Sequence, residues 1–217
     1  VSVEHKGGRC NHKDFNVSIE YVSGCKKTYS IEFKFGAKSV TKIPQFLSLS
    51  NPSTYTETSY EKFYYENYLS TILKEKFDLD LPHLTDYLKS VKTDNSANKC
   101  PYLLVIKERY KCDSEFKECF KKYSSESIKV FIEQNRLRKG KLQSKIDNTQ
   151  GNKIYMLFQN DTFYYDKPES FKIVHVKRDK NRYICDLEDG NNLKVLLRWK
   201  NRNGVTHPAF QISFHRN

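Results

Sequence analysis

The chain has 217 residues, 37% of them hydrophobic and 29% charged, which is enough for one sizeable core but not for a multidomain assembly. Its 38 lysines and arginines outnumber 26 acidic residues, and the net charge of +12 favours a polyanionic partner such as nucleic acid or an acidic membrane surface. The longest apolar runs, at residues 102–106 and 195–197, are far shorter than the roughly 18 residues of a transmembrane helix. We therefore expect no transmembrane span.

Cysteine usage and the first residues bear on the compartment. Six cysteines without a CxxC pair form neither a dense disulfide framework nor a standard zinc site. The start of the chain lacks the apolar segment of a signal peptide. Two glycosylation sequons, at Asn16 and Asn160, are of a kind common by chance in a chain rich in asparagine and serine. Reduced thiols and an intracellular, cytoplasmic location are expected.

Residues 14–35 alternate between apolar and polar side chains, the period of a strand with one buried face. The sequence Ser23-Gly24-Cys25-Lys26 divides them as a turn and predicts a β-hairpin. Its apolar positions are Phe15, Val17, Ile19 and Tyr21, then Tyr29, Ile31, Phe33 and Phe35.

The middle of the chain is predicted to be mostly helical. Apolar residues recur at helical spacing over residues 59–77, where Ser59 can cap the helix. Residues 82–91 and 125–137 are interpreted as further helices. The apolar run 102–106, which follows Pro101, is interpreted as a short buried strand.

Beyond this region the pattern changes. Residues 138–152, rich in lysine and arginine, are interpreted as a basic loop or linker. From Lys153 onward the period is two, with an Asp189-Gly190 turn. The fold class expected is α+β, with a central mixed sheet flanked by helices and a C-terminal antiparallel β-rich segment packed on it. The strands of that segment are predicted at residues 154–158, 171–177, 182–187, 193–199 and 210–214.

The polar face of the hairpin carries the candidate chemistry. With a turn centred between residues 24 and 25, Asp14 lies near Lys34, and Glu32 shares the face of Lys34. The carboxylates of Asp14 and Glu32, helped by the backbone carbonyl of Phe33, can hold Mg²⁺ with several waters attached. Such a metal activates a water and neutralises charge on a phosphodiester, while Lys34 orients the water. The pattern is typical of a metal-dependent phosphodiester hydrolase.

An amphipathic hairpin with solvent-facing Asp–Lys and Glu–Lys pairs is the structural alternative, and such pairs contribute little to stability. Glu-x-Lys occurs three times, beginning at Glu4, Glu32 and Glu115. Only the second lies between apolar strand residues, with Asp14 at the matching place on a partner strand. The residues alone leave both interpretations open.

The order Lys13-Asp14, strand, turn, Ser30-Ile31-Glu32-Phe33-Lys34 resembles the signature of PD-(D/E)xK nucleases, the superfamily of type II restriction endonucleases. The resemblance implies that Asp14 and Glu32 bind Mg²⁺ and that Lys34 acts on the attacking water. It also implies a nuclease core of restriction-endonuclease-like fold over residues 1–137, the basic linker at 138–152 and a DNA-gripping segment at 153–217. Lys13 stands where the signature has proline.

Candidate DNA contacts flank this motif and recur near the C-terminus. The stretch after Lys34 resembles the family's passage into a helix that faces DNA. Residues 196–212 offer a strand, an Asn-Gly turn and three cations, donors that grip phosphates or read guanine and adenine edges. The candidates are Lys13, Lys38, Gln45, Arg198, Lys200, Arg202, Asn203 and Gln211.

The function expected is Mg²⁺-dependent endonuclease activity on double-stranded DNA, in the form of a sequence-specific type II restriction endonuclease. A homodimer would let such an enzyme cut both strands symmetrically. A repair, junction-resolving or RNA-cleaving nuclease is the alternative within the superfamily. A non-catalytic nucleic-acid binder is the alternative outside it, because 15 Tyr and 14 Phe interleaved with lysine can stack bases. No membrane partner is expected.

Overall fold

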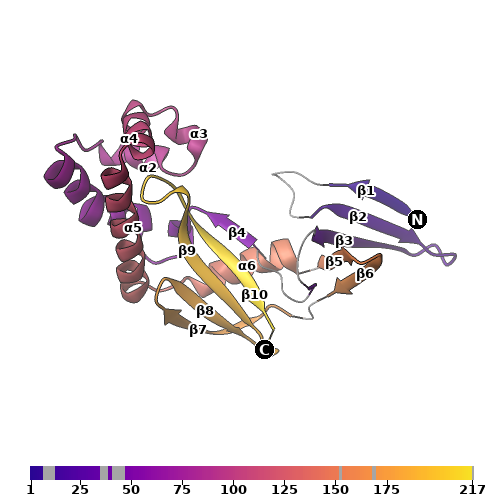
Figure 1. The fold of residues 1–217 in the computed structure, drawn as a ribbon. Helices are drawn as coiled ribbons and strands as arrows, with labels where there is room; N and C mark the ends of the chain where they lie inside the picture. Colours follow the sequence, from indigo (N-terminus) through magenta and orange to yellow (C-terminus); the bar gives the residue numbers. More distant parts are fainter. Residues whose placement is uncertain (7–12, 35–38, 41–46, 152, 168–169, 217) are drawn as a thin grey trace.

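The computed structural model describes residues 1–6, 13–34, 39–40, 47–151, 153–167 and 170–216. It is 39% helical and 36% strand, with two five-stranded sheets and a helical layer, which confirms the predicted α+β class (Figure 1). No helix in these ranges has the length and apolar character needed to span a membrane.

The first sheet contains the predicted hairpin and is mixed. Its order is β1-β2-β3-β5-β6, with β3 and β5 parallel and the other neighbours antiparallel. Two strands of the expected C-terminal segment therefore join the sheet of the N-terminal hairpin: β5 pairs with β3, and β6 pairs with β5. The bounds are β1 Ser2–His5, β2 Phe15–Glu20, β3 Lys26–Lys34, β5 Lys153–Gln159 and β6 Thr162–Asp166.

The hairpin register differs from the predicted one. Glu20 faces Lys26 and Phe15 faces Ile31, so the turn is centred on Ser23 and not between residues 24 and 25. The amide of Tyr21 donates to the Cys25 carbonyl at 2.9 Å and closes this turn. The predicted register is therefore wrong. At the open end the Asp14 amide donates to the Ile31 carbonyl and its carboxylate accepts from the Phe33 amide, which places Asp14 beside the segment that contains Glu32.

The two faces of the first sheet differ in chemistry. Cross-strand partners share a face, so Phe33, Met156 and Tyr165 lie on one side. On this side Phe163 and Tyr165 are 62% and 75% exposed. We call it the open apolar face. The opposite face carries Glu32 and the fully buried Tyr155.

The second sheet is antiparallel throughout, with the order β4-β10-β9-β8-β7. The predicted turn at residues 189–190 joins β8 to β9, with Gly190 at φ 83° and its amide bonded to the Leu187 carbonyl. Alternate residues of β9 are buried against the helical layer. The bounds are β4 Leu47–Ser50, β7 Ile173–Asp179, β8 Arg182–Leu187, β9 Asn192–Arg202 and β10 Thr206–His215.

The helical layer begins where Ser59 caps α1, its hydroxyl accepting from the Lys62 amide at 3.2 Å. This confirms the predicted helix at residues 59–77, although two stretches of it, Tyr65–Leu69 and Thr71–Lys76, are π-helical. The helices are α1 Tyr60–Tyr64, α2 Leu84–Ser90, α3 Asp94–Ala97, α4 Pro101–Cys112, α5 Ser114–Gln134 and α6 Lys139–Gln150, and a 3₁₀ turn spans Pro52–Thr54.

Two predicted elements are wrong. The run 102–106, expected as a strand, lies in α4, where Leu103 and Ile106 are buried and Val105 is exposed, a helical spacing. Pro101 occupies the first turn of that helix, where its missing N–H costs nothing. The basic stretch 138–152, expected as a loop, forms α6, which buries Leu142 and Ile146 and turns its cations outward.

A buried polar chain ties the helices to the second sheet. The indole of Trp199 on β9 donates to the Tyr60 hydroxyl at 3.0 Å, and Tyr60 is hydrogen-bonded to Ser127 of α5 at 3.0 Å. The ring of Phe131 packs edge-on against Tyr60 at 5.1 Å. This contact explains why the single tryptophan of the chain is buried.

The β9–β10 turn packs tightly into the same core. Gly204 has φ +76°, and a Cβ there would lie 2.4 Å from the Tyr64 hydroxyl. Gly190 has φ +83° with open space around it. We expect Gly190→Ala to lower the free energy of unfolding by about 1 kcal/mol from backbone strain, and Gly204→Ala by about 3 kcal/mol because overpacking is added. Urea denaturation measures both; equal losses would contradict the packing.

Candidate active site

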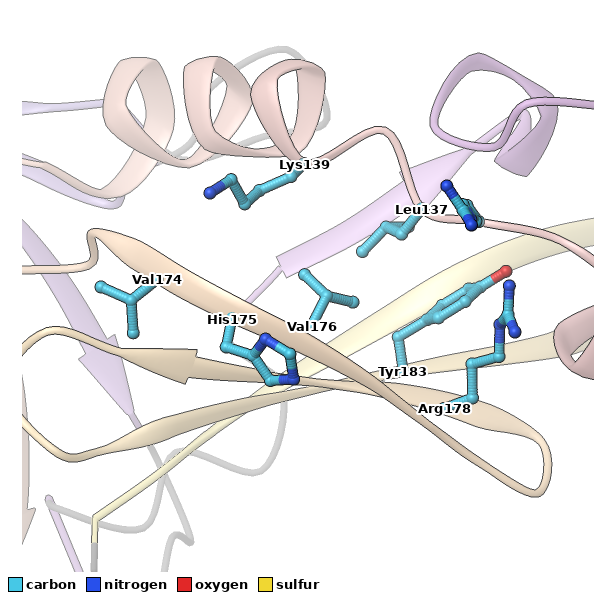
Figure 2. A pocket seen from close by; sticks show the side chains of 8 residues that line it. Leu137, Lys139, Val174, His175, Val176, Arg178 and Tyr183 are labelled. Carbon is cyan, nitrogen blue, oxygen red and sulfur yellow. The ribbon is translucent and has the colours of Figure 1, made fainter.

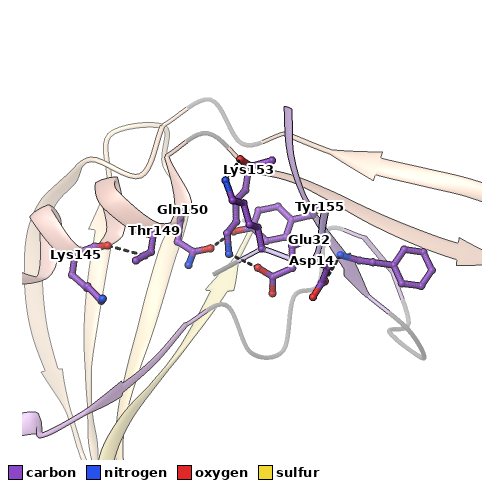
Figure 3. Close-up of polar contacts among 10 residues, drawn as sticks. Asp14, Glu32, Lys145, Thr149, Gln150, Lys153 and Tyr155 are labelled. Carbon is purple, nitrogen blue, oxygen red and sulfur yellow. Dashed lines mark hydrogen bonds and ion pairs between the residues drawn. The ribbon is translucent and has the colours of Figure 1, made fainter. Parts of the chain in front are cut away.

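Asp14 lies at the open end of the hairpin, immediately before β2. Its amide donates to the Ile31 carbonyl at 2.9 Å, although Ile31 faces Phe15 in the β2–β3 register, so the pairing becomes irregular at Asp14. Its carboxylate accepts a hydrogen bond from the Phe33 amide, with 2.8 Å between N and Oδ2 (Figure 3). The Asp14 carboxylate is therefore fixed beside the residue that follows Glu32.

Glu32 is held by a cation from the neighbouring parallel strand. Ser30 and Glu32 face Lys153 and Tyr155 in the β3–β5 register. The ammonium of Lys153 forms an ion pair with the Glu32 carboxylate (Figure 3), and the two side chains are only 5% and 17% exposed. At this burial the charges are weakly screened, so the pair fixes the orientation of the carboxylate.

Tyr155 and Gln150 form the inner wall of the site. The Tyr155 hydroxyl donates to Gln150 Oε1 at 2.7 Å, joining β5 to the end of α6. Burial raises the pKa of Tyr155 well above its usual value, and the carboxylates of Glu32 and Asp166 raise it further. The phenol therefore stays protonated and serves as a donor.

The donor set fits Mg²⁺. This ion is usually bound through one or two carboxylates, with waters and substrate phosphates completing its shell. Asp14 and Glu32 supply two carboxylates at one place. Within the described ranges no group of three or more His, Cys, Asp or Glu side chains gathers as for a metal cage. The carboxylate of Glu4 pairs instead with Lys6.

The remaining predicted groups of the motif are placed as follows. Phe33 contacts Asp14 through its amide, and metal binding by its carbonyl stays a prediction. Lys34 is the last residue of β3, two residues after Glu32, while its side chain is outside the described part. Lys38 and Gln45 also lie outside the described residues.

The predicted DNA contacts divide into separate groups. Lys13 lies at the hairpin, where its ammonium donates to the Ser30 hydroxyl at 3.3 Å. Arg198 and Gln211 are hydrogen-bonded to each other at 2.9 Å across β9 and β10. Arg202 and Asn203 lie at the β9–β10 turn, near Tyr110 of α4. The first sheet, with Asp14 and Glu32, lies on the side of the second sheet away from the helical layer (Figure 1).

The face of the second sheet that carries Arg198 gathers further cations. Burial lowers the pKa of Lys200, and the nearby Arg198 lowers it further. Burial also lowers the pKa of His215, with smaller contributions from Lys194 and Arg182. Arg198, Lys200, Lys194 and Arg182 share this face in the strand registers, and cations gathered on one face favour an anionic partner.

Sequence patterns did not identify Lys153, Tyr155 or Gln150 as site residues. Lys153 and Tyr155 stand two apart and so share a face of a predicted strand, which is the signal that was available. Their meeting with Glu32 depends on the parallel pairing of β3 with β5, which periodicity does not encode.

Comparisons of the chain with family models, with curated proteins and with solved structures find no match.

Replacing Lys153 tests the buried ion pair. Lys153→Met leaves a partly buried Glu32 without its cation, so we expect a loss of about 3 kcal/mol in the free energy of unfolding. Adding Glu32→Gln should recover most of that loss, because a neutral amide costs less to bury than a carboxylate. Lys141→Met, at an exposed position of α6, is the control. A loss below about 1 kcal/mol for Lys153→Met would show that the pair is not formed in solution.

Proposed function

We propose that the chain is a Mg²⁺-dependent endonuclease that hydrolyses DNA phosphodiester bonds, as the resemblance to PD-(D/E)xK nucleases implies. The observation that carries the proposal is the placement of Asp14 against Ile31 and Phe33, the two neighbours of Glu32, at the open end of the hairpin, with Lys153 paired to Glu32. A surface hairpin of solvated ion pairs would not need a cation as buried as Lys153.

Each residue of the site has a role that follows from its contacts. Asp14 and Glu32 would hold the ion, which when bound activates a water and offsets charge on the phosphodiester. The Phe33 amide orients the carboxylate of Asp14, and Lys153 orients that of Glu32. Lys153 is a positioning residue, whereas Lys34 is proposed to contact the attacking water. Tyr155 and Gln150 close the inner side against solvent.

The charge distribution supports a polyanionic substrate. The net charge is +12, and Arg198 and Lys200 share a face of the second sheet with Arg182 and Lys194. Cations on one face bind phosphates without regard to sequence, and amides such as that of Gln211 can add base readout. Sequence-specific restriction, acting as a homodimer on double-stranded DNA, is the proposed biological role.

DNA cleavage tests the proposal directly. Purified protein is incubated with plasmid and with long linear DNA in Mg²⁺ or in EDTA. We expect discrete Mg²⁺-dependent fragments, and a loss of at least about a hundredfold in rate for Asp14→Asn and for Lys34→Ala. Binding measured in EDTA should persist in both variants. Glu20→Gln, an exposed carboxylate at the far end of β2, is the matched control.

Other outcomes assign other functions. A smear in place of discrete fragments would indicate an unselective nuclease, and cleavage confined to RNA or to branched DNA would indicate an RNA or junction nuclease. Intact DNA under all conditions, together with a gel shift, would replace the proposal with a non-catalytic nucleic-acid binder.

Metal binding is testable without any substrate. A ligand that binds only the folded state raises the melting temperature, so we expect Mg²⁺ to stabilise the wild-type protein. Asp14→Asn should abolish that shift, while Glu20→Gln should keep it. Equal shifts in wild type and Asp14→Asn, measured by differential scanning calorimetry, would place the metal elsewhere.

A further inference from the structure

A pocket of about 610 Å³ opens beside the start of α6, away from Asp14 and Glu32. Its walls come from β7, from β8 and from the segment that joins α5 to α6 (Figure 2). Its lining residues are Arg136, Leu137, Lys139, Val174, His175, Val176, Arg178 and Tyr183.

The charge of this pocket is entirely positive. Arg136, Lys139 and Arg178 line it without any Asp or Glu among the described lining residues. None of the three cations makes an ion pair within the described part of the chain. The carboxylate of Glu57 lies close enough to add to the raised pKa of Tyr183 that burial causes, and Glu133 lines a neighbouring pocket that shares Arg178. A pocket of this kind favours an anion.

Arg178 is already positioned for a ligand. Its Nε donates to the Asn135 carbonyl at 3.1 Å, and the Tyr183 hydroxyl donates to the same oxygen at 3.3 Å. This bond fixes the guanidinium at the wall, and among the described residues its terminal N–H groups make no hydrogen bond or ion pair. An arginine held in this way loses little conformational entropy when it binds a phosphate oxygen.

The remaining wall is apolar. Val174, Val176 and the ring of Tyr183 face the pocket along β7 and β8, and Leu137 faces it from the opposite segment (Figure 2). Val174 is 48% exposed, so its side chain is accessible to a ligand. A ligand that is apolar on one side and anionic on the other matches both walls, and the volume lies within the range of roughly 300–1,000 Å³ that small-molecule sites have.

We propose that this pocket binds one nucleotide of a nucleic-acid strand, with the phosphate against Arg136, Lys139 and Arg178 and with the sugar or base against the valines. The proposal deepens the proposed function, on which it rests for the identity of the strand, while the binding itself requires no cleavage.

The pocket stands at a defined place relative to the carboxylate pair. It lies at the first residue of α6, and the last residue, Gln150, is hydrogen-bonded to Tyr155 in the site. A 12-residue helix is about 18 Å long. A duplex that ran along α6 would span this length with about five base pairs.

Fluorescence anisotropy in EDTA tests the pocket with no contribution from catalysis. The probes are a labelled 12-nucleotide single strand and a labelled 20-base-pair duplex. For Arg136→Gln/Arg178→Gln we expect Kd to rise at least about tenfold and the slope of log K against log salt to fall by about 1.4–1.8. Val174→Glu, which adds a carboxylate at an exposed position, should weaken binding similarly.

The matched control is Lys117→Gln/Lys141→Gln, which removes two exposed lysines of α5 and α6 that do not line the pocket. It carries the same change in net charge, so Kd should change less than about threefold. If binding weakened equally in the control and in the pocket variant, only the net charge would matter. That result would overturn the proposal. Circular dichroism confirms that each variant is folded.

Two further arms separate the sources of the nucleotide. Duplexes that extend less than about five base pairs on either side of a fixed centre cannot reach the pocket. They should therefore bind the wild-type protein and the pocket variant with equal affinity. Free dAMP at millimolar concentration should compete weakly with the strand. Tight dAMP binding with unchanged DNA affinity in the pocket variant would overturn the strand assignment. Loss of cleavage with normal pocket dependence of binding would refute the proposed function alone.

Discussion

The ion pair between Glu32 and Lys153 is the interaction on which the candidate site depends. It joins residues 121 positions apart and forms only because β3 and β5 run in parallel. Burying two charges is costly, and the cost is offset only when each charge keeps its partner in a fixed geometry. That geometry aligns Glu32 with Asp14, whose carboxylate is held by the Phe33 amide. Two carboxylates are thus oriented before any ligand arrives, which is the condition for binding a hard cation with little reorganisation.

α6 connects the two sheets and gives the site its surroundings. Near its middle the side chain of Gln143 accepts from the Ile173 amide at 2.7 Å and donates to the Phe171 carbonyl at 3.3 Å, which attaches the helix to β7. At its end Gln150 accepts from Tyr155. The same 12 residues therefore reach from the basic pocket to the carboxylate pair. A helix is stiff over this length, so the spacing between the two places is set by the fold.

Local patterns predicted most of the elements and less of their assembly. The hairpin, the Ser59 cap and the turn at residues 189–190 depend on neighbouring residues, and all three are confirmed. The strand predicted at 102–106 was wrong because a short apolar stretch suits a strand or a buried helix equally. The exposure of Leu104 and Val105, which distinguishes the two, is visible only in the fold. The shift in register arose because Tyr21 bonds to Cys25, so the turn lies earlier in the chain than the predicted centre between Gly24 and Cys25. Lys153 was missed because strand pairing across a hundred residues leaves no local pattern.

The open apolar face gives the molecule two opposite responses to ionic strength. Phe158, Phe163 and Tyr165 are exposed on a chain whose net charge is +12, so repulsion between copies opposes contact through that face. Salt shortens the reach of this repulsion to about 10 Å at 0.1 M, while strongly excluded anions such as sulfate favour burial of aromatic surface. The same salt weakens the hold of the cations on a polyanion. Conditions that release nucleic acid are therefore those in which the aromatic rings most readily meet a second apolar surface.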